Sequence, residues 1–245
     1  MALRGTAFLA LWNDIAAERD REYNCWHTFE HVPERVGIGG FVSGRRYAAR
    51  ERDDDRYFTL YELEGIDVLS APEYLDVVDR PTEWSSSMRA SFRNFLRHPC
   101  MTMFTSGQGI AGSIATFRIS AQDKLGDAQA SALRSSLQAS LQTDGVTSTH
   151  LGRAGADTRF PVGNTVAAEP PATAHYVLLV EGTGRNELEA AAPRIIDIVQ
   201  RSFIGSPSIV WNSFDLALIV ERADLQHSTA GRQPAHPDLK ARWSM

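Results

Sequence analysis

The chain has 245 residues, a length that allows one large domain or two small ones. It carries 25 Lys and Arg residues against 30 Asp and Glu residues, a net charge of −5, and so lacks the basic excess expected of a nucleic-acid-binding protein. Hydrophobic residues make up 43% and charged residues 22%, which excludes the disordered and fibrous classes.

The sequence offers no sign of export or of a membrane span. No apolar run reaches the roughly 18 residues of a spanning helix, and Trp12, Asn13 and Asp14 come too early for a secretory signal. Cys25 and Cys100 have no CxxC spacing, which is typical of buried thiols. We therefore expect a cytoplasmic protein.

Hydrophobic patterning predicts a β-α-β-β-α-β order in residues 1–108. The expected elements are a strand over 7–12, a helix over 16–35 that Pro33 ends or in whose last, irregular turn it lies, strands over 41–50 and 56–62, two helices within 67–96, and a strand over 101–105. This order is that of a ferredoxin-like unit.

The same order returns in residues 109–245. The expected elements are a strand over 113–119, a helix over 127–142, strands over 145–151 and 175–181, a helix over 186–202 and a strand over 208–221. A long loop is expected over 153–173, and a surface tail from about residue 223. The repeated order predicts an α+β chain of two tandem ferredoxin-like repeats.

Residues 26–47 read WHTFEHVPERVGIGGFVSGRRY, and YFTLYEL, LSAPEYL and PTEW follow at 57–63, 69–75 and 81–84. With this W-x-x-x-E-H-x-P-E-R pattern, residues 5–105 resemble the dimeric α/β-barrel superfamily, in particular its EthD-like branch. The resemblance implies two repeats packed sheet to sheet as an intramolecular α/β barrel around a pocket. The superfamily includes cofactor-free isomerases, cyclases, decarboxylases and monooxygenases together with haem-dependent enzymes, so the fold alone does not fix the function.

His31 is the candidate general acid/base because imidazole titrates near neutral pH. The resemblance implies a catalytic histidine near this helix end, which Glu30 or a tyrosine such as Tyr61 would orient. The alternative is a helix-end histidine that caps carbonyls or pairs with Glu30 or Glu34.

His27 and His31 also give the segment HTFEH, a match to the zinc motif H-x-x-E-H. Pro33, two residues after the second histidine, argues against a helical zinc site. The glycines over 37–40 precede a strand and lack the spacing of a nucleotide-binding loop. We therefore expect no metal and no cofactor.

Other candidates are expected to bind substrate or to face the barrel. Arg45 and Arg46 point to opposite faces of a strand, and we take Arg46 as the candidate for a substrate carboxylate, the alternative being an ion pair with Glu34 or Glu62. Arg35 is expected to be structural. The residues expected to line an apolar pocket, or else to pack in the core, are Trp12, Trp26, His27, Tyr47, Tyr57, Tyr61 and Trp84. His150, His175 and Trp211 could face the barrel cavity, whereas His98, His227 and His236 are expected in solvent.

These residues predict a cofactor-independent lyase, isomerase or cyclase that acts on a small aromatic or unsaturated keto acid by histidine acid/base catalysis. A non-catalytic barrel that binds a small molecule or serves in assembly, and a cofactor-free monooxygenase, are the alternatives. The expected partner is a small-molecule substrate, with no nucleic acid and no membrane. A homodimer is a further expectation, because such barrels associate readily.

Overall fold

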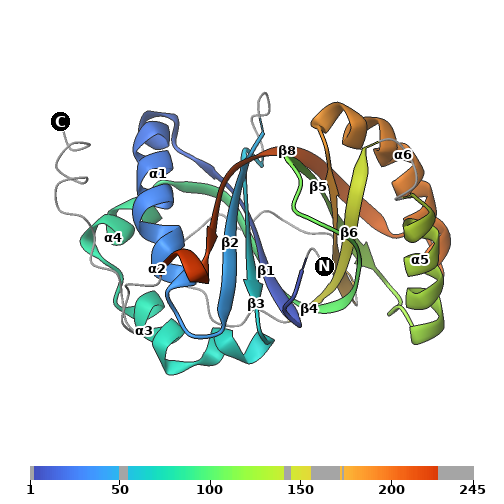
Figure 1. The fold of residues 1–245 in the computed structure, drawn as a ribbon, viewed down its shortest axis with the longest axis horizontal. Coiled ribbons are helices and arrows are strands. Elements are labelled where there is room, and N and C mark those ends of the chain that lie inside the picture. Colours follow the sequence, from blue (N-terminus) through green and yellow to red (C-terminus); the bar gives the residue numbers. More distant parts are fainter. Residues whose placement is uncertain (1–2, 50–54, 141–144, 156–171, 173, 226–245) are drawn as a thin grey trace.

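Eight antiparallel strands close one barrel, in the order β1-β3-β2-β8-β5-β7-β6-β4 (Figure 1). The structure is a computed structural model that describes residues 3–49, 55–140, 145–155, 172 and 174–225. The strands are β1 (Ala7–Ile15), β2 (Phe41–Ala48), β3 (Tyr57–Leu63), β4 (Phe92–Gly107), β5 (Ser113–Ala121), β6 (Val146–Ala154), β7 (Ala174–Gly182) and β8 (Ser208–Glu221).

Helices cover the barrel on two opposite sides (Figure 1). The first group is η1 (Ala17–Arg19), α1 (Asp20–Trp26), η2 (His27–His31), α2 (Val32–Val36), η3 (Ile66–Ser70), α3 (Pro72–Asp79) and α4 (Glu83–Arg89), and the second is α5 (Asp127–Ser140) and α6 (Arg185–Ser202). A short turn, η4 (Arg222–Leu225), follows β8. Within the described residues, no helix has the length and apolar character needed to cross a membrane.

Two sets of four strands meet edge to edge to close the barrel. The strands of the first half lie in the order β4-β1-β3-β2, and those of the second half in the order β8-β5-β7-β6. The sets join where β2 pairs with β8 and where β4 pairs with β6. The expectation of an α+β fold is confirmed, and all eight pairings are antiparallel.

Aromatic side chains fill the centre of the barrel. The Phe58 ring lies 5.1 Å from Trp12, 5.7 Å from Tyr47 and 5.6 Å from Phe214, measured between ring centroids. All four side chains are at most 1% exposed. The pocket that the resemblance implied inside the barrel is therefore occupied at this level by the protein's own core.

The strand β4 begins earlier than the sequence predicts. Residues 92–96 were expected at the end of the second helix within 67–96, but Phe92 and Phe95 belong to β4 and pack against α1 and α4. Tertiary packing decides between the two periods here, since such a short apolar pattern fits either. As a result His98 lies on a strand and is buried, so its expected exposure was wrong.

Several other expectations can be checked. Cys25 and Cys100 are buried thiols, as predicted. Most of the 153–173 segment and of the tail, with His227 and His236, lies outside the described residues.

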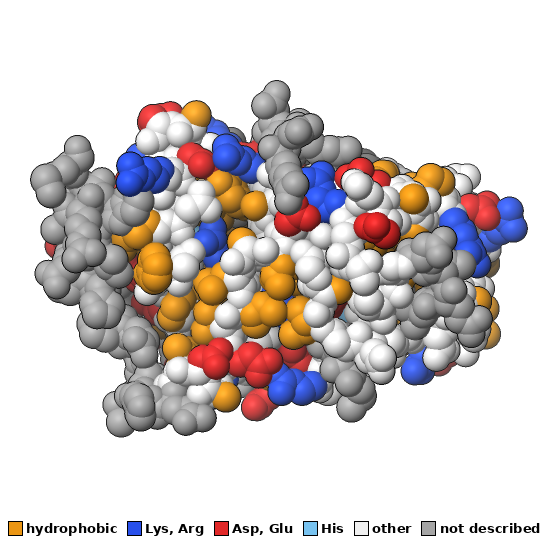
Figure 2. All heavy atoms as spheres, turned by 45° about the horizontal axis from the view of Figure 1, so that its top comes forward, with side chains coloured by type: hydrophobic (Ala, Val, Ile, Leu, Met, Phe, Trp, Pro, Cys, Tyr) orange, Lys and Arg blue, Asp and Glu red, His pale blue; other side chains and the backbone are white. Residues whose placement is uncertain are grey.

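Figure 2 shows hydrophobic side chains at the surface between the two groups of helices, where β8 has partly or fully exposed residues from Leu216 to Ile219.

Candidate functional site

The helix against the outer face of β1, β2 and β3 contains a π-helical turn. The turn is η2, with the sequence HTFEH, and it joins α1 to α2 without a break from Asp20 to Val36. Pro33 was expected to end the helix or to lie in its last, irregular turn, and it lies in that last turn, at the second residue of α2 and directly after the π turn. π turns inside α-helices occur frequently at functional sites.

His27 and His31 stack on one another beneath this turn. Their ring centroids are 5.2 Å apart, and the rings are inclined by 21°. His31 also packs on Trp26 at 4.4 Å, and His27 stacks on Tyr23 at 5.0 Å. The Nδ1 atoms of both histidines are buried and have no hydrogen-bond partner among the described residues. Buried polar atoms without partners are rare, and they are candidates for contact with a ligand.

Both histidines are held in the neutral form. Burial is the main reason that the pKa of His31 lies well below 6.5, and the positive charges of Arg35, Arg89 and Arg46 lower it further. For His27, burial again comes first, followed by Arg46, His31 and Arg35. A neutral imidazole can accept a proton, so at neutral pH each histidine is available as a base.

Tyr61 faces the same region from the outer face of β3. Its hydroxyl is buried and has no hydrogen-bond partner among the described residues. Burial raises the pKa of Tyr61 far above its usual value, while Arg35 and Arg46 oppose the rise. The same two arginines therefore act on Tyr61 and on both histidines. The tyrosine keeps its proton and can donate a hydrogen bond.

Arg46 and Glu30 are occupied in holding the helices in place. Arg46 donates to the carbonyl of Asn24 at 3.2 Å, to Asn24 Oδ1 at 2.9 Å and to the Thr28 hydroxyl. Glu30 accepts from Ser85 at 3.0 Å and from the Thr82 hydroxyl, both at the start of α4. Arg46 thus ties α1 to β2, and Glu30 ties the π turn to α4.

The predicted aromatic residues fall into two separate sets. Trp26, Tyr57, Tyr61 and Trp84 lie between the helices and the outer face of the sheet, as His27 and His31 do. Trp12 and Tyr47 point into the barrel on the other face. A single pocket lined by all of them is therefore excluded, because the sheet separates the two sets.

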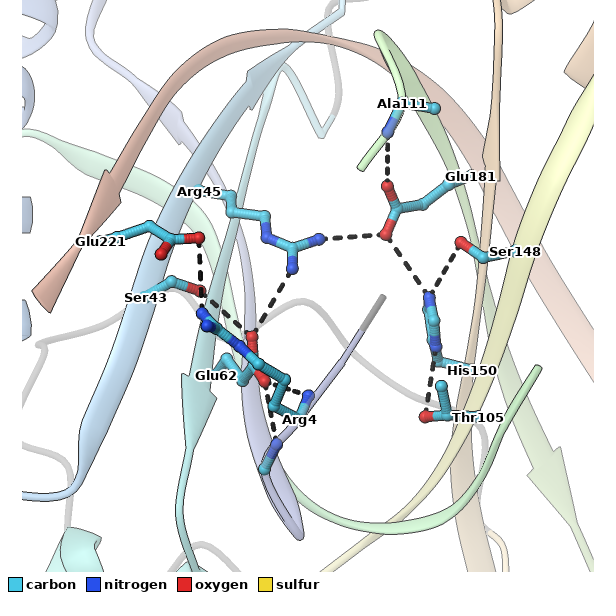
Figure 3. Close-up of polar contacts among 11 residues, drawn as sticks. Arg4, Ser43, Arg45, Glu62, Thr105, Ala111, Ser148, His150, Glu181 and Glu221 are labelled. Carbon is cyan, nitrogen blue, oxygen red and sulfur yellow. Dashed lines mark hydrogen bonds and ion pairs between the residues drawn. The ribbon is translucent and has the colours of Figure 1, made fainter. Parts of the chain in front are cut away.

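Arg45 points into the barrel, where it forms a buried ion-pair network (Figure 3). Its guanidinium lies 3.6 Å from Glu62 and 3.0 Å from Glu181, and Glu181 lies 3.4 Å from His150 Nε2. His150, Arg45 and the Ala111 N–H together outweigh burial and lower the pKa of Glu181. The pairing with Glu62, which the sequence left open as an alternative, is confirmed for Arg45.

The other strand residues that the sequence singled out lie partly inside the barrel and partly on the outer face of the sheet. His98 and His175 lie inside the barrel, with their rings stacked 6.0 Å apart. Trp211 packs against Phe117 on the outer face of the sheet, so it does not face the barrel cavity. Arg35 pairs with Glu34 at 3.1 Å, which agrees with its expected structural role. Among the residues that the structure describes, no group of three or more His, Cys, Asp or Glu side chains is arranged to hold a metal.

Comparison with known proteins gives structural neighbours only. No protein-family model and no curated protein matches the sequence. An anthrone oxidase-like protein has a TM-score of 0.65 and 10% identity, over 94% of this chain and 99% of that one. A candidate monooxygenase of Fusobacterium nucleatum has a TM-score of 0.56 and 10% identity, over 89% and 96% of the two chains. One of Lactobacillus acidophilus has a TM-score of 0.55 and 7% identity, over 89% and 97%.

At such identities the likeness shows the fold. The expected α/β-barrel architecture is therefore supported, whereas the family that the resemblance implies stays a prediction. The EthD-like motif stays a prediction. His31, His27 and Tyr61 stay predicted site residues. The sequence did not predict the π turn, whose only signal was a proline placed where a regular helix would be disturbed.

Proposed function

We propose that the chain is a cofactor-independent enzyme in which His31, assisted by His27, removes a proton from an aromatic substrate. The observation that carries the proposal is the set of three buried polar atoms without partners, His27 Nδ1, His31 Nδ1 and Tyr61 Oη, in one basic region beneath a π turn. We also interpret the two sets of four strands as tandem ferredoxin-like units, the first of which carries this site.

The charges around the histidines favour a reaction that forms an anion. Arg35 and Arg46 act on both histidines, and Arg89 also acts on His31. When a neutral histidine takes a proton from the substrate, a nearby guanidinium stabilises the resulting carbanion, enolate or phenolate. The Tyr61 hydroxyl can donate a hydrogen bond to the negatively charged oxygen of the enolate or phenolate. The suitable substrates are phenols and ketones with an acidic C–H group.

The likeness to monooxygenase folds supports molecular oxygen as the second substrate. The base removes one proton from a methylene group, the carbanion passes one electron to O2, and recombination with return of a proton gives a hydroperoxide. Loss of water from the hydroperoxide leaves a carbonyl. The methylene group and O2 thus become a ketone and one molecule of water, and the protein supplies only proton transfer and charge stabilisation.

The first test is oxygen uptake with anthrone, a tricyclic ketone with an acidic methylene group, measured against the enzyme-free rate. We expect catalysis in the wild type, no change after dialysis against EDTA, and a loss of about 100-fold or more in His31→Gln, as general bases contribute. His175→Gln is the matched control because His175 lies inside the barrel.

The second test separates oxygenase from isomerase or lyase chemistry. In D2O without oxygen, the proposed base exchanges the acidic C–H of the substrate for deuterium, which NMR detects. If the substrate exchanges its C–H in D2O but no oxygen is consumed when the reaction is run in air, the isomerase, cyclase or lyase prediction is supported. Absence of both exchange and oxygen uptake across a panel of phenols and aromatic ketones would overturn the proposed function.

A further inference from the structure

A groove of about 500 Å³ lies on the outer surface where β4 and β6 pair. It is bounded by the first two turns of α5, on the opposite side of the barrel from the π turn (Figure 1). This is the range of volume in which small organic ligands bind. The groove shares no residue with the histidine site.

The floor of the groove is apolar and adaptable. Phe104 is 7% exposed and forms its base, while Met103 is partly buried against the same core. Met101 is 42% exposed, which makes it one of the few large hydrophobic side chains that reach solvent. Unbranched methionines change shape readily around an apolar ligand.

Two arginines border this floor from different elements. Arg134 on α5 has only long hydrogen bonds, 3.4 Å to the Ser106 hydroxyl and 3.5 Å to the Thr105 carbonyl. Arg153 on β6 is exposed, and its side chain makes no ion pair or hydrogen bond with any described residue. Asp127 is the one acid in the lining, so the groove has an excess of one positive charge.

We propose that this groove binds an organic anion with an apolar body, of the size of an aromatic carboxylate. The carboxylate lies between Arg134 and Arg153, and the apolar body lies on Met101, Met103 and Phe104. Guanidinium groups bind carboxylates by paired, charge-assisted hydrogen bonds, and here they come from a helix and a strand that the fold holds together. The site is independent of the proposed reaction.

The test uses methionine methyl NMR with 2-naphthoate as the probe. The chain has five methionines, so the spectrum is simple, and Met101→Leu and Met103→Leu assign the two groove signals. Met88 packs with Trp26 and Trp84 near the histidine site and reports binding there. We expect the Met101 and Met103 signals to shift as 2-naphthoate is added and to saturate with their own apparent Kd, independently of any shift of the Met88 signal.

Controls of similar shape that lack the charge test whether binding depends on the carboxylate and the two arginines. We expect 2-naphthamide, which has the same body without the charge, to bind at least tenfold more weakly, and the double variant Arg134→Gln/Arg153→Gln to weaken naphthoate binding to a similar degree. Arg201→Gln, a 78% exposed arginine on α6, should leave binding unchanged. The proposal fails if the Met101 and Met103 signals do not move, or if naphthamide or the double variant binds as well as naphthoate binds the wild type.

Discussion

Arg45 Nη1 lies 3.0 Å from Glu181 Oε1 and connects β2 of the first half to β7 of the second inside the barrel (Figure 3). Both side chains are almost completely buried. Glu181 also accepts from the Ala111 N–H at 2.9 Å, in the segment that joins the two halves. This buried ion pair joins the two halves inside the barrel, in addition to strand pairing and to the ion pairs Arg118–Asp55 and Arg4–Glu221.

Replacing Arg45 by Met should destabilise the protein strongly. Removal of one partner leaves Glu62 and Glu181 buried without their cation, which costs about 3–5 kcal/mol in comparable cases. We expect a fall of this size in the free energy of unfolding, measured by urea denaturation. Arg80→Met removes a surface pair with Asp76 and should cost less than about 1 kcal/mol. Equal stabilities of the two variants would show that the network does not hold the halves together.

His31→Gln should separate activity from folding. His31 is partly exposed as a residue and its buried Nδ1 has no partner among the described residues, so glutamine can replace it without breaking a hydrogen bond of the described structure. We expect kcat/KM to fall about 100-fold or more with the melting temperature within a few degrees of the wild type. His27→Gln should cause a smaller loss. A variant that folds and keeps full activity would remove His31 from the mechanism.

The pH dependence of stability follows from the two histidines. Their pKa values in the folded protein lie well below 6.5, whereas the unfolded chain binds protons near that value. The unfolded state therefore takes up more protons as the pH falls, so this contribution is complete above about pH 6.5 and is lost progressively below it. Melting temperatures from about pH 8 to pH 5 should fall less in the His27→Gln/His31→Gln variant. Identical curves for the variant and the wild type would contradict the neutral state of the pair.

Gly44→Ala should force α2 away from the sheet. A Cβ atom at this position would lie 2.8 Å from Val32 Cγ1, 2.9 Å from Val36 Cγ2 and 3.0 Å from Tyr61 Cε1. We expect a destabilisation of about 1–3 kcal/mol, as for overpacked cores, together with lower activity because Tyr61 and the π turn are displaced. Gly155→Ala, whose Cβ would meet only the Pro99 carbonyl at 3.8 Å, is the control. Equal melting temperatures of the two variants would refute this packing argument.

Local patterns in the sequence were enough to predict the order and type of nearly all the described helices and strands. Alternating and 3.6-residue apolar patterns are local, so they fixed strands such as Ser113–Ala121 and helices such as Arg185–Ser202 to within a few residues. The two histidines of the candidate site came from one segment, HTFEH, which places them one turn apart, whereas Tyr61 came from the strand segment YFTLYEL. Alternation also showed that Arg45 and Arg46 face opposite sides of β2.

The sequence could not predict which face of the sheet carries the candidate site, because that depends on the tertiary structure. Whether a strand face meets helices or the barrel interior depends on how distant strands pair, and here Trp12 and Tyr47 turn inward while Trp26 and Tyr61 lie beneath the helices. The start of β4 at Phe92, the burial of His98 and the continuation of the helix past Pro33 likewise depend on packing between segments far apart in the chain. Local patterns carry no information about those contacts, because each contact needs a partner that the pattern does not contain.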